Sequence, residues 1–284
     1  MSAIAITGAT GQLGRLVIEK LKSKVPATEI VALVRTPEKA SSLGVTARKA
    51  DYNDPATFKE ALKGAKTLLL ISSNDLGKRA AQHRNVIEAA KAAGVERIVY
   101  TSLLHADTTA ITVLAEEHLA TEADVKASGV PFTILRNGWY TENYTASVPG
   151  AVAGGAFLGS AGDGKISSAA RADYAEAAAT VLAGAGHAGK VYELAGDEAY
   201  TLSDLAAEIS RQTGKEIPYK NLPEADYAAA LVGFGLPAPM AQAYAGFDTG
   251  AAQGALFENS KELSRLIGHA TTPLAVSVAA ALKG

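Results

Sequence analysis

Short apolar runs alternate with amphipathic segments from the first residues to about Arg136. Most of these runs are almost continuously apolar, which is typical of strands covered on both faces of a parallel sheet. Six of them have the length of a strand, at residues 3–6, 30–34, 45–50, 67–72, 97–102 and 131–136. The alternation predicts right-handed crossovers and a doubly wound parallel α/β sheet.

The segments between these runs have the spacing of helices. Residues 12–22 place apolar side chains on one face, and residues 78–93 end at Gly94, which predicts a helix C-cap there. Each expected strand of the first half is therefore followed by a helix or a turn that returns the chain to the same edge of the sheet.

Beyond Arg136 this rhythm breaks, and residues 150–164 are rich in glycine and alanine. The expected elements there are a helix at 171–183, a strand at 191–196 and a helix at 201–214 with Ser203 as its cap. We expect a domain at residues 1–136, followed at 137–284 mainly by a smaller lobe that is interleaved with late sheet elements and closes over a ligand.

Composition narrows the class of protein. The 284 residues carry 27 basic and 29 acidic side chains, so the net charge of −2 indicates no nucleic-acid or anionic-membrane partner. The absence of cysteine excludes disulfides, thiolate zinc sites and cysteine nucleophiles. The first residues show no pattern of a secretory signal and no apolar run has spanning length, so we expect neither a signal peptide nor a transmembrane helix. We expect a cytoplasmic monomer or homodimer.

The segment TGATGQLG, residues 7–14, follows the first expected strand and opens the first helix. Its spacing Gly-x-x-Gly-x-x-Gly is a variant of the dinucleotide fingerprint. Such a site needs a tight turn, close approach of the backbone to a pyrophosphate, and close helix packing at its three glycines. The context predicts a Rossmann dinucleotide site, and the alternative is a glycine-rich turn without a ligand. The expected cofactor contacts are Gly8, Ala9, Thr10, Gly11, Gln12 and Leu13.

The end of the second expected strand indicates which dinucleotide binds. A NAD site places Asp or Glu there, whereas this chain has Arg35, with Lys39 one turn later. Two cations suit the 2′-phosphate of NADP, so we predict NADP(H) as the cofactor; the alternative is that Arg35 is a solvated surface charge. Asp51 follows the third strand and is a candidate for polar contacts near the adenine, although it also suits an ordinary turn.

Four blocks of this sequence resemble a known family. They are TGATGQLG (7–14), NVIEAAKAAGVERIVYTS (85–102), LRNGWYTENY (135–144) and LIGHATTPLAVSV (266–278). Together they resemble the NmrA-like group of atypical short-chain dehydrogenase/reductases, and within it the branch of bacterial quinone oxidoreductases and triphenylmethane dye reductases. The resemblance extends over essentially the whole chain. It implies NADPH along the carboxyl edge of the sheet and a substrate pocket formed by the smaller lobe.

The resemblance also implies roles for individual residues. Ser72 and Ser73 are expected beside the cofactor. The segment after the sixth strand is expected to border the nicotinamide and the pocket; it consists of Asn137, Gly138, Trp139, Tyr140, Thr141, Glu142 and Asn143. Its aromatic rings suit a planar acceptor and its amides suit a quinone oxygen, so Asn137 and Tyr140 are catalytic candidates. The alternative is that the rings pack the junction with the lobe and the amides cap a turn.

Family members with ordinary carbonyl chemistry carry Tyr-x-x-x-Lys on the helix after the fifth strand, where the tyrosine supplies a proton. In this chain the matching positions hold His118 and Glu122. His118 is therefore a third catalytic candidate, because histidine titrates near neutral pH. The alternative is a local pair between His118 and Glu122 on the helix flank.

These observations predict an NADPH-dependent reductase that transfers hydride directly to a quinone or a similar electron-poor planar acceptor, without flavin or metal. Such acceptors need little acid catalysis, so positioning supplies most of the rate. The other histidines match no metal site, and no Gly-x-Ser-x-Gly elbow supports a hydrolase. Two alternatives remain: a carbonyl, enone or triphenylmethane dye reductase on the same scaffold, and an NADP-binding redox sensor of the NmrA type.

Overall fold

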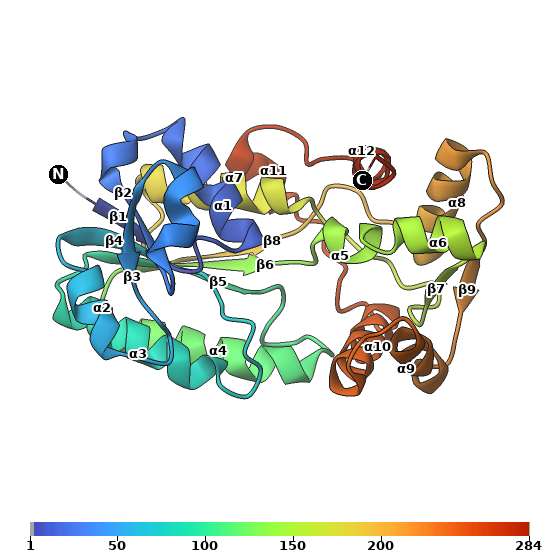
Figure 1. Ribbon diagram of the computed structural model, residues 1–284, viewed down its shortest axis with the longest axis horizontal. Helices are drawn as coiled ribbons and strands as arrows, with labels where there is room; N and C mark the ends of the chain where they lie inside the picture. The colour runs from blue at the N-terminus through green and yellow to red at the C-terminus, as the bar shows by residue number, and fades with distance from the viewer. Residues whose placement is uncertain (1–2, 284) are drawn as a thin grey trace.

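The computed structural model describes residues 3–283 and is built on a parallel sheet of seven strands (Figure 1). The strand order is β3-β2-β1-β4-β5-β6-β8, and every pair is parallel. The strands are β1 (Ala3–Ile6), β2 (Ile30–Val34), β3 (Thr46–Lys49), β4 (Ala65–Leu70), β5 (Arg97–Leu103), β6 (Phe132–Asn137) and β8 (Lys190–Leu194). The doubly wound α/β fold predicted from the hydrophobic pattern is confirmed, and the predicted strands agree with the observed ones to within two residues.

Helices cover both faces of this sheet (Figure 1). On one face lie α1 (Gln12–Lys22), α7 (Arg171–Ala183) and α11 (Glu262–Ile267); on the other lie α2 (Ala56–Ala61), α3 (Arg79–Ala92) and α4 (Thr112–Ala127). Two short 3₁₀ segments, Ala27–Glu29 and Pro37–Leu43, flank β2. The apolar side chains of each face form a buried core of their own, which explains why the strands are apolar at nearly every position.

The remaining elements form a lobe beyond the carboxyl edge of the sheet (Figure 1). They are α5 (Thr141–Thr145), α6 (Val148–Gly154), β7 (Phe157–Gly159), α8 (Leu202–Thr213), β9 (Tyr219–Asn221), α9 (Glu224–Gly233), α10 (Ala238–Ala252) and α12 (Leu274–Ala281). Strands β7 and β9 pair in parallel, and the lobe has a third core that includes Trp139 and Phe247. Because β8, α7 and α11 return to the main sheet, residues 137–283 contribute to both parts.

Two helix C-termini end at glycine as the sequence predicts, whereas one N-cap differs from its prediction. Gly94 has a φ of +72° and Gly214 a φ of +67°, so both predicted glycine ends are confirmed. The Ser203 prediction was wrong: Thr201 caps α8, because its hydroxyl accepts from the Asp204 backbone N–H while the Asp204 carboxylate accepts from the Thr201 N–H. Within residues 3–283, no helix is both long enough and apolar enough to cross a membrane.

Candidate cofactor and acceptor site

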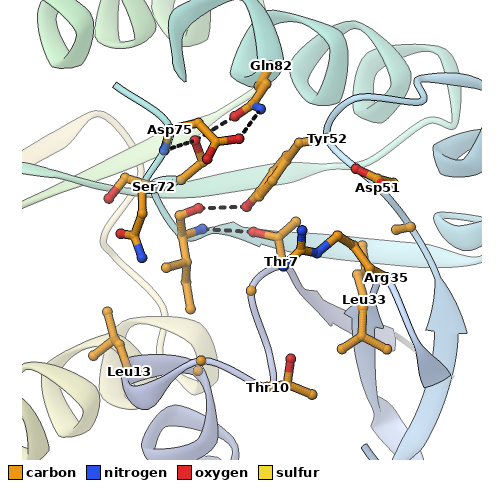
Figure 2. A pocket seen from close by; sticks show the side chains of 18 of the residues that line it. Thr7, Thr10, Leu13, Leu33, Arg35, Asp51, Tyr52, Ser72, Asp75 and Gln82 are labelled. Carbon is orange, nitrogen blue, oxygen red and sulfur yellow. Dashed lines mark hydrogen bonds between the residues drawn. The ribbon is translucent and has the colours of Figure 1, made fainter. Parts of the chain in front are cut away.

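A cavity of about 540 Å³ lies at the carboxyl edge of the sheet, over β1, β2, β3 and β4. In open α/β sheets this edge is where ligands bind. Figure 2 shows side chains that line it, with Arg35 and Asp51 on one side of the view and Leu13 on the other. Ten of the predicted cofactor contacts lie on its lining: Gly8, Thr10, Gly11, Gln12, Leu13, Arg35, Asp51, Ser72, Ser73 and Tyr140.

The glycine loop forms the floor of the cavity between β1 and α1. Gly8 has a φ of +59°, a conformation that favours glycine, and its carbonyl accepts from the Gly11 N–H at 2.9 Å. A Cβ on Gly14 would lie 2.4 Å from the Gly8 oxygen and 2.7 Å from the Ala9 Cα, so only glycine fits there. The loop therefore brings the backbone and the start of α1 to the cavity without side chains in the way, a geometry that suits a phosphate.

Hydrogen bonds between loops hold the wall next to this floor (Figure 2). The Thr7 hydroxyl donates to the Leu69 carbonyl at 3.2 Å and accepts from the Ile71 N–H at 2.9 Å. The Tyr52 hydroxyl donates to the Ile71 carbonyl at 2.7 Å. These bonds tie the ends of β1, β3 and β4 together, so the wall is a preformed part of the fold.

The loop after β4 is anchored from beneath by α3. His83 Nε2 accepts from the Ser73 N–H at 3.0 Å, and the Ser73 hydroxyl donates to Gln82 Oε1 at 2.6 Å. Burial, aided by the charge of Arg79, lowers the pKa of His83 to about 3, so the imidazole stays a neutral acceptor. Gln82 Nε2 donates onward to Asn53 at 2.9 Å and to Asp75 at 2.8 Å. Ser73 is thereby held at the cavity, and the Ser72 N–H donates to Thr101 Oγ1 at 2.9 Å.

Arg35 and Asp51, both predicted for the adenosine end, lie at the same end of the cavity (Figure 2). Arg35 is exposed and lies on the lining, whereas Lys39 is exposed and outside it. Asp51 Oδ1 accepts from the Asn53 N–H at 3.0 Å, so Asp51 shapes a turn and also faces the cavity. One cation, rather than two, therefore lies where a 2′-phosphate is expected.

Only part of the segment after β6 reaches the cavity lining. Tyr140 reaches the lining, and the neighbouring Asn137 is buried with its Nδ2 3.5 Å from the Tyr140 oxygen. Within residues 3–283, Asn137 Oδ1 has no hydrogen-bond partner. Burial raises the pKa of Tyr140, an effect that the Asn137 amide and the Arg171 charge oppose only in part, so the phenol keeps its proton.

The other residues of this segment serve packing and connection. Trp139 packs on Phe247 in the lobe core, and the Thr141 hydroxyl shares a hydrogen bond of 2.8 Å with that of Ser168. A Cβ on Gly138 would lie 2.9 Å from the Leu194 carbonyl oxygen. Glu142 and Asn143 both accept from Arg171. These residues and Ala9 lie off the lining, and their contacts with a cofactor stay predictions.

His118 and Glu122 lie buried beneath the sheet edge and off the lining. His118 Nδ1 shares a hydrogen bond of 2.7 Å with the Tyr100 hydroxyl, and burial, with the charge of Arg79, lowers its pKa well below the usual value. Glu122 accepts from Arg136 and from the Ser102 hydroxyl; burial raises its pKa, but these bonds outweigh burial and lower it. The geometry favours anchoring roles, and the catalytic role expected of His118 stays a prediction.

Several lining residues lay outside the sequence prediction, among them Thr7, Tyr52, Gln82 and Arg171. Thr7 and Tyr52 come within three residues of the ends of β1 and β3, so their position after a parallel strand is a signal that could have found them. Gln82 and Arg171 lie on helices, and nothing local in the sequence marks them. Their place depends on how α3 and α7 pack against the sheet.

The chain is similar to known proteins over nearly its whole length. A model of the NmrA-like family matches residues 1–273. Quinone oxidoreductase 2 of Escherichia coli K12 is 61% identical over 97% of each chain. The crystal structure of the NADPH-dependent quinone oxidoreductase from E. coli complexed with NADPH superposes with a TM-score of 0.95, at 60% identity over 98% of this chain and 99% of that one. The triphenylmethane reductase of Citrobacter sp. also has a TM-score of 0.95, at 39% identity over 99% of this chain and 100% of its own.

Proposed function

The chain belongs to the NmrA-like family, and we propose that it is an NADPH-dependent oxidoreductase that transfers hydride directly to a quinone or a similar electron-poor planar acceptor. The 61% identity with quinone oxidoreductase 2 of E. coli, over 97% of each chain, supports this proposal. The reaction needs neither flavin nor metal, since a quinone is reduced by one hydride and one proton. When bound, the reduced nicotinamide supplies that hydride.

The cavity residues fit the cofactor. Glycine at position 14, where a Cβ would collide with the Gly8 and Ala9 backbone, lets α1 pack closely on the loop and present its N-terminus to a pyrophosphate. Arg35 offers the guanidinium that a 2′-phosphate requires. We assign the cofactor contacts expected from the sequence to this cavity and to the segment after β6. Tyr52 and Gln82 join them as the wall of the adenosine end.

Asn137 and Tyr140 are the proposed catalytic pair. Asn137 Nδ2 points to the Tyr140 oxygen, so the hydrogen of the Tyr140 hydroxyl is free to bind an acceptor oxygen. The neutral phenol can therefore stabilise charge that develops on that oxygen. Asn137 Oδ1, buried and unpartnered among the described residues, offers an acceptor to a ligand N–H or O–H group.

The lobe forms the substrate side of the proposed site. Its aromatic core begins at Trp139, directly before Tyr140, so the lobe and the cavity share one segment of chain. We expect an enzyme of the cytoplasm, where NADPH is regenerated, that acts as a monomer or a homodimer on a small quinone.

Product analysis tests this function. The purified chain is mixed anaerobically with NADPH and a simple quinone, and its absorbance spectrum is inspected for flavin. The proposal requires one hydroquinone formed for each NADPH consumed by a protein without flavin absorbance. Tight binding of NADPH with no reduction of quinones, ketones or dyes would instead identify a dinucleotide sensor.

A further inference from the structure

Arg171 places a positive charge on the cavity lining, whose other residues except Tyr140 come from the first 82 positions of the chain. It is the first residue of α7, and its side chain is only 13% exposed. Its guanidinium carbon lies 4.3 Å from the centroid of the Tyr140 ring, and Nη2 donates to Asn143 Oδ1 at 3.2 Å. The stacking and the hydrogen bond together fix the cation against the proposed catalytic tyrosine.

The nearest carboxylate offsets this charge only in part. Glu142 accepts from the backbone N–H of Arg171 at 2.9 Å and 3.1 Å, so both of its oxygens cap the N-terminus of α7. Its closest approach to the guanidinium is 3.8 Å, and its side chain is 40% exposed, where solvent screens it. Glu142 therefore reduces the positive charge of Arg171 at the cavity without cancelling it.

The position of Arg171 relates it to the acceptor rather than to the adenosine. Arg35, Asp51 and Asp75, the other charged residues of the lining, come from the loops after β2, β3 and β4. Tyr140 and Arg171 come from the far side of the glycine loop, after β6 and at the start of α7. A dinucleotide that begins at Arg35 and crosses the glycine loop directs its reactive end toward Tyr140 and Arg171.

We propose that Arg171 sets the charge preference of the acceptor site, so that acceptors which become anionic are favoured over acceptors which are cationic. This inference rests on the proposed function. A neutral quinone that accepts a hydride, with its two electrons, becomes the hydroquinone monoanion, and a proton from water completes the hydroquinone while the cofactor leaves oxidised. A cationic triarylmethane dye that accepts the same hydride becomes neutral. Arg171 stabilises the first product and repels the second acceptor.

The test compares three acceptors that differ in charge: a sulfonated naphthoquinone, a neutral benzoquinone and a cationic triarylmethane dye. Each is assayed for kcat/KM with saturating NADPH in the wild type, R171Q and R171K. Arg265→Gln is the control, because Arg265 is exposed on α11 and lies outside the cavity lining. In R171Q, we expect the ratio of sulfonated quinone to cationic dye turnover to fall on the order of 10- to 100-fold. R171K and R265Q should keep the wild-type order.

A second measurement does not depend on turnover. Trp139, the only tryptophan, precedes Tyr140, so its fluorescence reports the binding of each acceptor to the protein with NADP⁺. R171Q should bind the sulfonated quinone more weakly and the dye as tightly or more tightly. A parallel loss for all acceptors, or an equal loss of NADPH affinity, would overturn the proposal. If the wild type does not reduce quinones, the proposed function is wrong. The role of Arg171 is still tested in that case, because the affinities for the sulfonated quinone and the dye can be compared without turnover.

Discussion

The Glu122 carboxylate and the Arg136 guanidinium form a two-pronged ion pair in the interior. Arg136 Nε donates to Oε1 at 2.8 Å, and Nη2 donates to Oε2 at 2.9 Å. Arg136 also donates to Glu193 at 2.8 Å, and the Glu122 side chain is 1% exposed. The sequence resemblance predicts Glu122 at the position of the lysine of carbonyl reductases. In the structure, Glu122 joins α4 to Ser102 of β5 and Arg136 of β6, and Arg136 in turn reaches Glu193 of β8.

Glu122→Gln should therefore affect stability more than chemistry. Removing the Glu122 charge breaks the two-pronged buried pair and leaves Arg136 only partly compensated, by Glu193 and Asp107, which costs about 3 kcal/mol of the free energy of unfolding. Urea denaturation measures the loss. Glu116→Gln, an exposed change on the same helix, is the control and should be neutral. Unchanged stability with abolished turnover would instead give Glu122 a role in the reaction.

The pH dependence of turnover decides the role of His118. Burial keeps its imidazole neutral, so kcat/KM should show no inflection from this group between about pH 5.5 and 7.5, a window of one unit either side of the ordinary histidine pKa. His118→Gln and Tyr100→Phe each remove their shared hydrogen bond and should each cost about 1 kcal/mol of stability. An inflection near neutral pH that disappears in His118→Gln, but not in Tyr100→Phe, would establish His118 as a proton donor.

Arg35→Asp should reverse the cofactor preference. The substitution replaces a charge-assisted contact with repulsion of the 2′-phosphate, so the Kd for NADPH should rise roughly 10- to 100-fold or more while that for NADH changes little. Lys39→Asp makes the same charge change at an exposed position outside the lining and should have a much smaller effect. Fluorescence titration of the reduced cofactors measures all of these constants. Equal changes in the two variants would show that Arg35 makes no local contact.

Asp248 in α10 should make the lobe more stable in mild acid. Its carboxylate accepts from the Ser160 N–H at 2.8 Å and from the Tyr144 hydroxyl at 3.1 Å, and burial raises its pKa to about 6. The native carboxyl keeps its proton up to that pH, whereas the unfolded one releases it near pH 4, so the native state binds more protons in between. The free energy of unfolding should fall by about 2 to 3 kcal/mol as the pH rises from 4 through 6.

Asp248→Asn provides the direct comparison, because an amide fills the same space without ionising. The variant should lose this pH-dependent part of the stability, which denaturation at pH 4.5 and pH 7 measures. Asp226→Asn, at an exposed position on α9, should leave the change of the free energy of unfolding with pH, the pH slope, as it is in the wild type. If the Asp248 variant keeps that slope, Asp248 is not its source.

The sequence predicted the features that local pattern determines. The predicted limits of β1, α1 and α7 agree with the observed ones residue for residue, because apolar periodicity and helix ends are properties of neighbouring residues. The glycine loop was likewise recognisable, since three glycines at this spacing between a strand and a helix are typical of a dinucleotide site. The cavity contains most of that loop.

The sequence did not predict which residues tertiary packing brings together. Arg171 lines the same cavity as Arg35, 136 positions earlier in the chain, only because α7 packs against α1 on one face of the sheet. The partners of His118 and Glu122, Tyr100 and Arg136, lie on the strands beneath α4 rather than on the helix itself. A pairing of His118 with Glu122 at helical spacing is a local prediction, and long-range contacts took its place.

Steady-state oxidation of NADPH with a simple quinone, with NADH as the parallel control, is the most direct test of hydride transfer by this protein. We predict saturable, quinone-dependent turnover with a clear preference for NADPH. A protein that binds NADPH tightly but leaves the quinone unreduced, or that uses NADH equally well, would contradict this assignment.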